Sequence, residues 1–135
     1  MMPAPEAGGL LAEFEAGRVD PAAFPHRAHV EVGYELLQRH PYPEALLHLA
    51  RGLRRLATRA GRPEVYHETI TAAFLAVIAE RWLEAAAAGW EDFAARNPDL
   101  LQKNLLENFY DPALLNSALA RQTFVLPRRA SSHAA

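Results

Sequence analysis

The stretch PHRAHVEVGYELLQRHPYP, residues 25–43, decides the fold. Its apolar side chains recur at helical spacing, so we expect a helix from Pro25 to about His40. Pro41 stops that helix, because proline lacks the amide donor of a continuing helix, and Pro43 suits the first turn of the next one. A joint of so few residues makes the two helices antiparallel neighbours. The stretch therefore predicts the first hairpin of a helical bundle.

The rest of the chain repeats this pattern of helix formers between prolines and glycines. Ala, Leu, Glu and Arg dominate, and the alternation typical of strands is almost absent. Asp20 and Pro21 open a turn or a short helical piece. The longer predicted helical segments follow the punctuation of the chain: 10–16, 43–60, 63–88, 91–96, 100–108 and 112–121. We predict an all-α protein, a compact up-down helical bundle with short C-terminal helices packed across it.

The chain has 135 residues, the size of one domain. We expect a single helical domain over residues 1–127, with its core at about 24–127 and a disordered tail over 128–135. No run of 18 apolar residues is present, which argues against a membrane segment or a membrane partner. The N-terminus lacks the basic region of a signal peptide. The sequence therefore predicts a soluble, cytoplasmic protein.

Charge and cysteine content exclude several classes of function. The chain carries 14 Lys and Arg against 16 Asp and Glu, so it has no overall basic footprint for a nucleic-acid partner. It has no cysteine, which excludes disulfides, thiolate metal sites and cysteine nucleophiles. Arginines at helical spacing over residues 51–62 form either a solvated helix face paired with Glu or a site for phosphate or an acidic partner.

Helical periodicity divides the six histidines of the chain. At about 100° per residue, His26 and His29 fall on the apolar stripe of their helix, and His67 falls on the apolar face of the 63–88 helix. The other three are expected at a helix end, on a polar face and in the tail: His40, His48 and His133. The first and third long helices of an up-down bundle run parallel, so we expect the three inward histidines to meet at one end of the core.

Convergent imidazoles are what a metal site needs. Three histidines without a thiolate suit Zn, Fe, Cu, Ni or Mn. Glu68 is a candidate fourth ligand or general base, and Tyr66 and Tyr34 are candidate phenols for a ligand or a proton relay. Thr71 stands where the H-E-x-x-H motif requires its second histidine, which argues against a metalloprotease. The first hypothesis is thus a metal-binding protein, including a small metalloenzyme that acts on a small organic molecule.

Two other functions fit the same residues. A histidine on a helix face is more often a hydrogen-bonded core residue than a ligand. The second hypothesis is therefore a metal-free ligand-binding or acid–base site, with His67 and Glu68 as the proton-transfer pair. The third is an interaction or scaffold module that forms a homodimer or docks a partner through an apolar face: Trp82, Trp90 and Phe93. Imidazoles bonded singly to different backbone carbonyls would indicate a structural role.

Four motifs occur in order along the chain: Phe24–Val30 (F-x-H-x-x-H-V), Tyr66–Thr71 (Y-H-E-T-I-T), Asn97–Leu101 (N-P-x-L-L) and Ala120–Pro127 (A-R-x-x-F-V-x-P). Together they resemble a family of small bacterial all-helical proteins to which no activity is assigned. The resemblance spans about residues 24–127 and implies that this whole stretch forms a single fold. It emphasises four residues without naming a reaction: His26, His29, His67 and Glu68.

The chain departs from this family pattern at two positions. Ala72 stands where the family often has a tryptophan after the T-I-T string, and Arg128 stands where it closes on aspartate. We expect the first change to enlarge or reshape an inner cavity and the second to affect only the tail.

Overall fold

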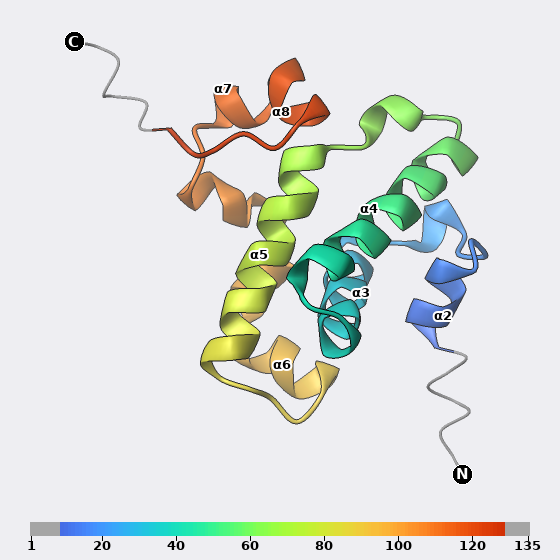
Figure 1. The fold of residues 1–135 in the computed structure, drawn as a ribbon, viewed down its shortest axis with the longest axis vertical. Helices are drawn as coiled ribbons and strands as arrows, with labels where there is room; N and C mark the ends of the chain where they lie inside the picture. The colour runs from blue at the N-terminus through green and yellow to red at the C-terminus, as the bar shows by residue number, and fades with distance from the viewer. Residues whose placement is uncertain (1–8, 129–135) are drawn as a thin grey trace.

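The computed structural model describes residues 9–128, and all regular structure in that range is helical (Figure 1). The α-helices are α2 (Leu10–Glu15), α3 (His26–Arg39), α4 (Tyr42–Arg59), α5 (Glu68–Glu84), α6 (Trp90–Arg96), α7 (Pro112–Leu115) and α8 (Ala118–Gln122). Short 3₁₀ turns join them: η1 (Pro21–Ala23), η2 (Pro63–Val65), η3 (Pro98–Leu101) and η4 (Lys103–Asn108). The all-α prediction is confirmed. The expected tail, apart from Arg128, lies outside the described residues.

Three long helices form the centre of the molecule. α3, α4 and α5 each pack against the other two, and α2 lies against α3 and α4 on one side. Figure 1 shows α7 and α8 beside the first turns of α5 and α6 near its other end. Of these, α8 packs on α5 and α6 packs on α3. The short C-terminal helices therefore cover the central three-helix unit, as the sequence predicts.

The buried side chains form two clusters on either side of α3. One joins α3, α5, α6 and the C-terminal segments, and the other joins α2, α3 and α4. Phe14 of α2 belongs to the second cluster and stacks on Phe24, with ring centroids 5.5 Å apart. A Cβ atom at Gly52 would collide with the Phe14 ring. Glycine at this position of α4 is therefore what allows α2 to pack so closely.

The helix expected over residues 63–88 is shorter at both ends. Residues Pro63–Val65 form the separate turn η2, and α5 begins only at Glu68 and ends at Glu84. His67 is the N-cap of α5, with extended backbone and a ring nitrogen that accepts the Ile70 N–H at 3.1 Å. His67 is buried, as the sequence predicts, but its assignment to a helix face is wrong, because the chain is not helical at that residue.

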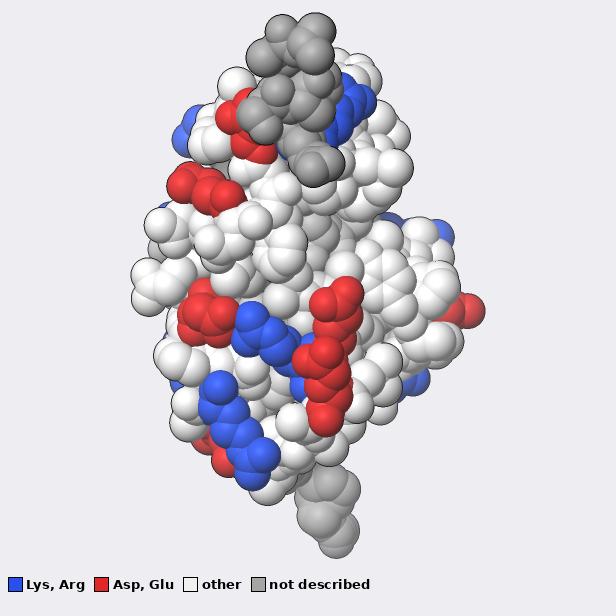
Figure 2. Space-filling view, turned by 90° about the vertical axis from the view of Figure 1, so that its left-hand side faces the viewer, with Lys and Arg blue, Asp and Glu red and all other residues white. Residues whose placement is uncertain are grey.

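The basic stretch over residues 51–62 largely supports the loop that follows α2. Arg55 donates to the Glu15 carbonyl at 3.0 Å, and Arg59 donates to the Gly17 carbonyl at 2.8 Å. Capping of helix-end carbonyls by arginine is a structural role. Figure 2 shows one face of the molecule, on which basic side chains lie between acidic ones and gather into no large patch of one sign. Within the described range, no helix has the length and apolar character that crossing a membrane requires.

Candidate functional site

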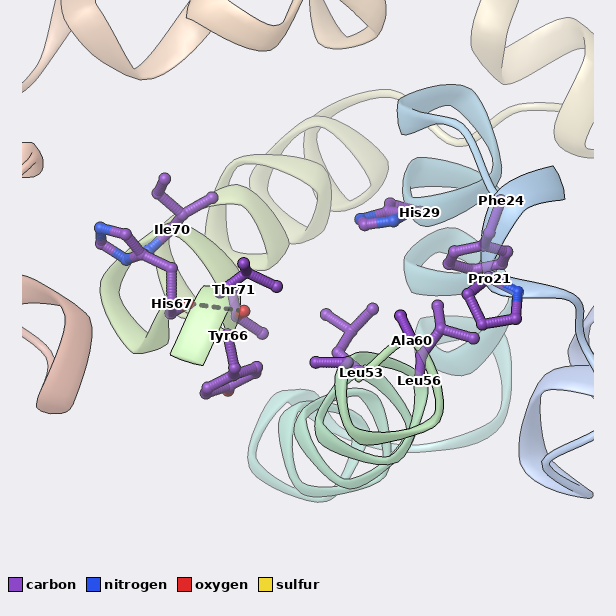
Figure 3. Close-up of a pocket in the computed structure, with 12 residues that line it drawn as sticks. Pro21, Phe24, His29, Leu53, Leu56, Ala60, Tyr66, His67, Ile70 and Thr71 are labelled. Carbon is purple, nitrogen blue, oxygen red and sulfur yellow. Dashed lines mark hydrogen bonds between the residues drawn. The ribbon is translucent and has the colours of Figure 1, made fainter. Parts of the chain in front are cut away.

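A cavity of about 340 Å³ opens between α3, α4 and the start of α5 (Figure 3). Most of its wall is apolar and comes from η1 and α4 with their C-cap residues, from η2 and from α5: Pro21, Phe24, Leu53, Leu56, Ala57, Ala60, Val65 and Ile70. Four residues bring polar groups to it: His29, Tyr66, His67 and Thr71. An inner cavity of about 60 Å³ adjoins it and shares His29, Leu53, Ile70 and Thr71. This size and lining are typical of small-molecule sites.

His29 stands on the wall common to both cavities. It lies in the first turns of α3, where its ring packs on Phe24 with centroids 4.6 Å apart, and Figure 3 shows it projecting from α3 toward the open space. Burial lowers the pKa of His29 to about 4, the charges of His26 and Lys103 act in the same direction, and only the Phe24 carbonyl opposes them. The ring is therefore neutral near pH 7, with one donor and one acceptor nitrogen. Among the described residues the Phe24 carbonyl is the recorded hydrogen-bond partner of this ring, and no buried side-chain nitrogen or oxygen is left without a partner, so the other ring nitrogen is open to the cavity.

His67 also reaches the cavity wall, but both of its ring nitrogens are engaged. Nε2 lies 2.7 Å from the Leu115 carbonyl, and Nδ1 accepts the Ile70 N–H. These partners assign the proton to Nε2, which donates to Leu115 and so ties the start of α5 to α7. Burial lowers the pKa of His67, and the Leu115 carbonyl acts in the opposite direction. The ring is a neutral structural bridge.

His26 is tied to another part of the chain. Its Nε2 lies 3.0 Å from the Leu100 carbonyl in η3, and its ring contacts Phe74 edge-on at 4.9 Å. The His26 and His29 ring centroids are 6.4 Å apart. His26 and His67 thus bond different carbonyls, and no group of three or more His, Asp or Glu able to hold a metal exists within residues 9–128. The structure does not bring the three histidines to one point, and metal binding stays a prediction.

Glu68 makes its side-chain contacts with Tyr66 and Arg54 rather than with His67. Its Oε1 accepts the Tyr66 hydroxyl at 2.9 Å and lies 3.3 Å from Nη2 of Arg54, whose guanidinium lies over the Tyr66 ring at 4.7 Å. Burial above all raises the pKa of Tyr66 to about 12, so the phenol stays protonated as a donor. The expected proton-transfer pair of His67 and Glu68 is not formed. Glu68 belongs instead to a cluster at the cavity rim with Tyr66 and Arg54.

Tyr34 lies away from the cavity, although the sequence suggests a place beside it. Its ring packs among Trp82, Trp90 and Phe93, with centroids 4.6–5.9 Å away. Trp90 and Phe93 are themselves buried. The apolar face expected to dock a partner is therefore mostly internal. Homodimer formation stays a prediction, but this face does not support it.

The α4 side of the cavity has no counterpart among the predicted site residues. Leu53, Leu56, Ala57 and Ala60 lie at i, i+3, i+4 and i+7 along α4 and form one wall. The signal in the sequence is the change from leucine to alanine along this stripe, because small residues leave space beside a helix. Ala72 gives no such space to the inner cavities. It lines a separate hollow between α4 and α5, so the structure does not place it at an inner cavity, and the effect of this family departure stays a prediction.

Fold and cavity together define a helical protein with an apolar pocket whose wall contains two neutral imidazoles, His29 and His67. Comparison with known proteins adds no assignment: no family model, no curated protein and no solved structure matches the chain. The resemblance carried by the four motifs stays a prediction. The motif residues nevertheless contact one another in pairs, since His26 bonds Leu100 and Thr69 bonds Thr123.

Proposed function

We propose that this protein binds a small, largely apolar molecule in the cavity between α3, α4 and α5, with His29 as its main polar contact. The observation that carries the proposal is the neutral His29 ring, which faces both cavities and whose recorded partner is only the nearby Phe24 carbonyl. The ring nitrogen that does not face Phe24 is open to the cavity, because no described buried side-chain nitrogen or oxygen lacks a partner. A ligand hydroxyl or carbonyl would bond this nitrogen in place of solvent.

The other inward histidines support this assignment by contrast. His26 and His67 each bond a backbone carbonyl of a distant segment, so the stability of the fold accounts for them. The recorded partner of His29, the Phe24 carbonyl, is only five residues away and joins no distant segment. The remaining wall is apolar, which favours a ligand body of carbon atoms, and a half-open cavity of this size admits such a molecule from solvent.

Calorimetric titration with octan-1-ol at pH 7.5 tests the proposal. The wild-type chain should bind the alcohol, and His29→Phe, which keeps an aromatic ring against Phe24, should weaken binding about tenfold, the worth of one hydrogen bond. Ala60→Trp should abolish it, because Ala60 is an exposed residue on the cavity wall. Ala95→Trp is the matched control, since Ala95 is exposed on α6 away from the cavity. Equal binding by the Ala60→Trp and Ala95→Trp variants would contradict the proposal.

The metal hypothesis is tested on the same variants. A metal held by the predicted ligands requires His26 and His67 to leave the Leu100 and Leu115 carbonyls. Elemental analysis of untagged protein, followed by thermal melts with Zn, Cu, Fe, Ni and Mn, gives the answer. A stoichiometric metal that His29→Phe removes would replace the ligand proposal with a metal centre.

A further inference from the structure

A second hollow, of about 440 Å³, lies next to the cavity and has a different character. It is lined mostly by polar and charged residues of α4, η2 and α8: Arg54, Thr58, Glu64, Arg121 and Gln122. Tyr66 lines both spaces, and η2 gives Val65 to the cavity and Pro63 to the hollow. The same short segment is therefore the rim of both, and a molecule that extends past Tyr66 from the apolar cavity enters the charged hollow.

The charges around this hollow favour an anion. Arg54 is exposed and gives one N–H to Glu68, at 3.3 Å, although a guanidinium carries five N–H donors. Arg121 lies on the α8 side of the hollow and is also exposed. Glu64 faces Arg62 at 3.8 Å outside the lining. The lining itself thus has two guanidinium groups, Arg54 and Arg121, against the one carboxylate of Glu64, and its net charge is positive.

The Arg54 guanidinium, which gives only one of its N–H donors to Glu68, is also fixed in position. It stacks on the Tyr66 ring at 4.7 Å, and Tyr66 is itself fixed by its hydroxyl bond to Glu68. A guanidinium whose plane is fixed in this way loses little freedom when it binds a carboxylate through two parallel N–H bonds. Uncharged donors such as Gln122 and Thr58 surround it.

We infer that the ligand is an amphipathic carboxylic acid, whose apolar body occupies the cavity and whose carboxylate lies in the hollow between Arg54 and Arg121. This inference rests on the proposed function, because it assigns the apolar part of the ligand to the same cavity. The cavity wall accepts carbon atoms and at most one uncharged polar group at His29, whereas an ionised group is stable only where arginines and solvent meet it.

Octanoate and octan-1-ol share an apolar chain and differ at the end group. Comparing them therefore tests the acid inference separately from the proposed function. At pH 7.5 and low salt, octanoate should bind at least about tenfold more tightly than the alcohol. The Arg121→Gln variant should bind octanoate about tenfold more weakly than wild type and should bind octan-1-ol with unchanged affinity. Arg54→Gln should act in the same way, with a thermal melt to confirm folding after the loss of its Glu68 contact. Arg51→Gln, an exposed arginine of the same helix outside the hollow, should change neither.

Every other result of these titrations overturns either the acid inference alone or the proposed function with it. Equal affinity for acid and alcohol, or octanoate binding that Arg54→Gln and Arg121→Gln both leave unchanged, overturns the acid inference and leaves the apolar cavity as the ligand site. Octanoate that binds Ala60→Trp as tightly as wild type is held at the surface, which also overturns the inference. Binding of neither probe overturns the proposed function and the inference together.

Discussion

The start of α5 and the first turns of α3 both bring histidines to one cavity, but their hydrogen bonding differs. At the start of α5, His67 bonds Leu115 and Ile70, and the fully buried Thr69 accepts the Val125 N–H at 3.0 Å while donating to the Thr123 carbonyl at 2.8 Å. In α3, His29 faces open space. Polar groups at the start of α5 hold the C-terminal segments onto the fold, whereas the one in α3 is available to a ligand.

This difference shows that the position of a residue on a helix face does not decide its role. Periodicity assigns His26, His29 and His67 to one class, yet their hydrogen-bond partners divide them: His26 and His67 bond distant carbonyls, whereas the recorded partner of His29 is local. A buried polar group that the fold already satisfies needs no ligand, while a buried polar group next to a cavity and without such a bond is a candidate for recognition. The following substitutions test that division.

The largest effect is expected at His67. His67→Leu should lower the free energy of unfolding by about 3 kcal/mol, because it removes the N-cap of α5 and leaves the buried Leu115 carbonyl without its donor. His67→Asn should recover part of this loss, since asparagine caps a helix but is too short to reach Leu115. Urea unfolding measures both. A loss below about 1 kcal/mol for His67→Leu would show that the bridge contributes little.

Acid pH should produce the next largest effect, and it should depend on His29. Its pKa is about 4 in the folded chain against 6.5 for an unperturbed histidine, so the unfolded chain takes up the proton first as the pH falls. The contribution of His29 to the free energy of unfolding is therefore fully present above pH 6.5 and is lost as the pH falls toward 4. The loss is about 2 kcal/mol at pH 5. Urea unfolding at pH 7.5 and pH 5 should show this loss in wild type and a smaller one in His29→Phe. The lowered pKa values of His26 and His67 account for the remainder. An identical loss in both proteins would exclude His29 as its source.

A smaller effect is expected from Thr69→Val, which keeps the shape of the side chain. The change should cost about 1.5 kcal/mol, because the Thr123 carbonyl and the Val125 N–H both lose a buried partner. Thr58→Val, at an exposed position of α4, serves as the control and should change stability by less than about 0.5 kcal/mol. Limited proteolysis reports the expected release of the segment after α8. Equal unfolding curves for the two variants would remove Thr69 from the contacts that hold this segment.

Much of the fold follows from local punctuation in the sequence. Pro41 marks the boundary between α3 and α4, and Gly17, at φ 74°, follows α2 where the sequence places its end. The residue at which α5 begins could not be predicted from such punctuation, because the residues expected to begin the helix form the separate turn η2. Histidine is also an uncommon N-cap, so the sequence gives little sign that His67 would cap a helix.

The candidate site was predictable only where one helix determines the outcome. The position of His29 on the inner side of α3 needs only the 3.6-residue period and the proline that precedes the helix. Which atoms meet its ring depends on how far α4 stands from α3, and Leu56 and Ala60 of α4 set that space. Tyr34 illustrates the same limit, since its aromatic partners come from α5 and α6 and only the tertiary fold brings them together.

The smallest effect, and the one of opposite sign, is expected from His29→Phe at pH 7.5. The free energy of unfolding of the variant should be about 0.5–1 kcal/mol higher than that of wild type, because an apolar ring replaces a desolvated imidazole whose recorded partner is only the Phe24 carbonyl, beside a cavity with room for it. His26→Phe is the matched control and should destabilise, since it leaves the Leu100 carbonyl without its bond. A histidine that lowers stability where phenylalanine would raise it is retained for a purpose other than folding. If His29→Phe destabilises as much as His26→Phe, both rings are structural and the distinction between the two regions is wrong.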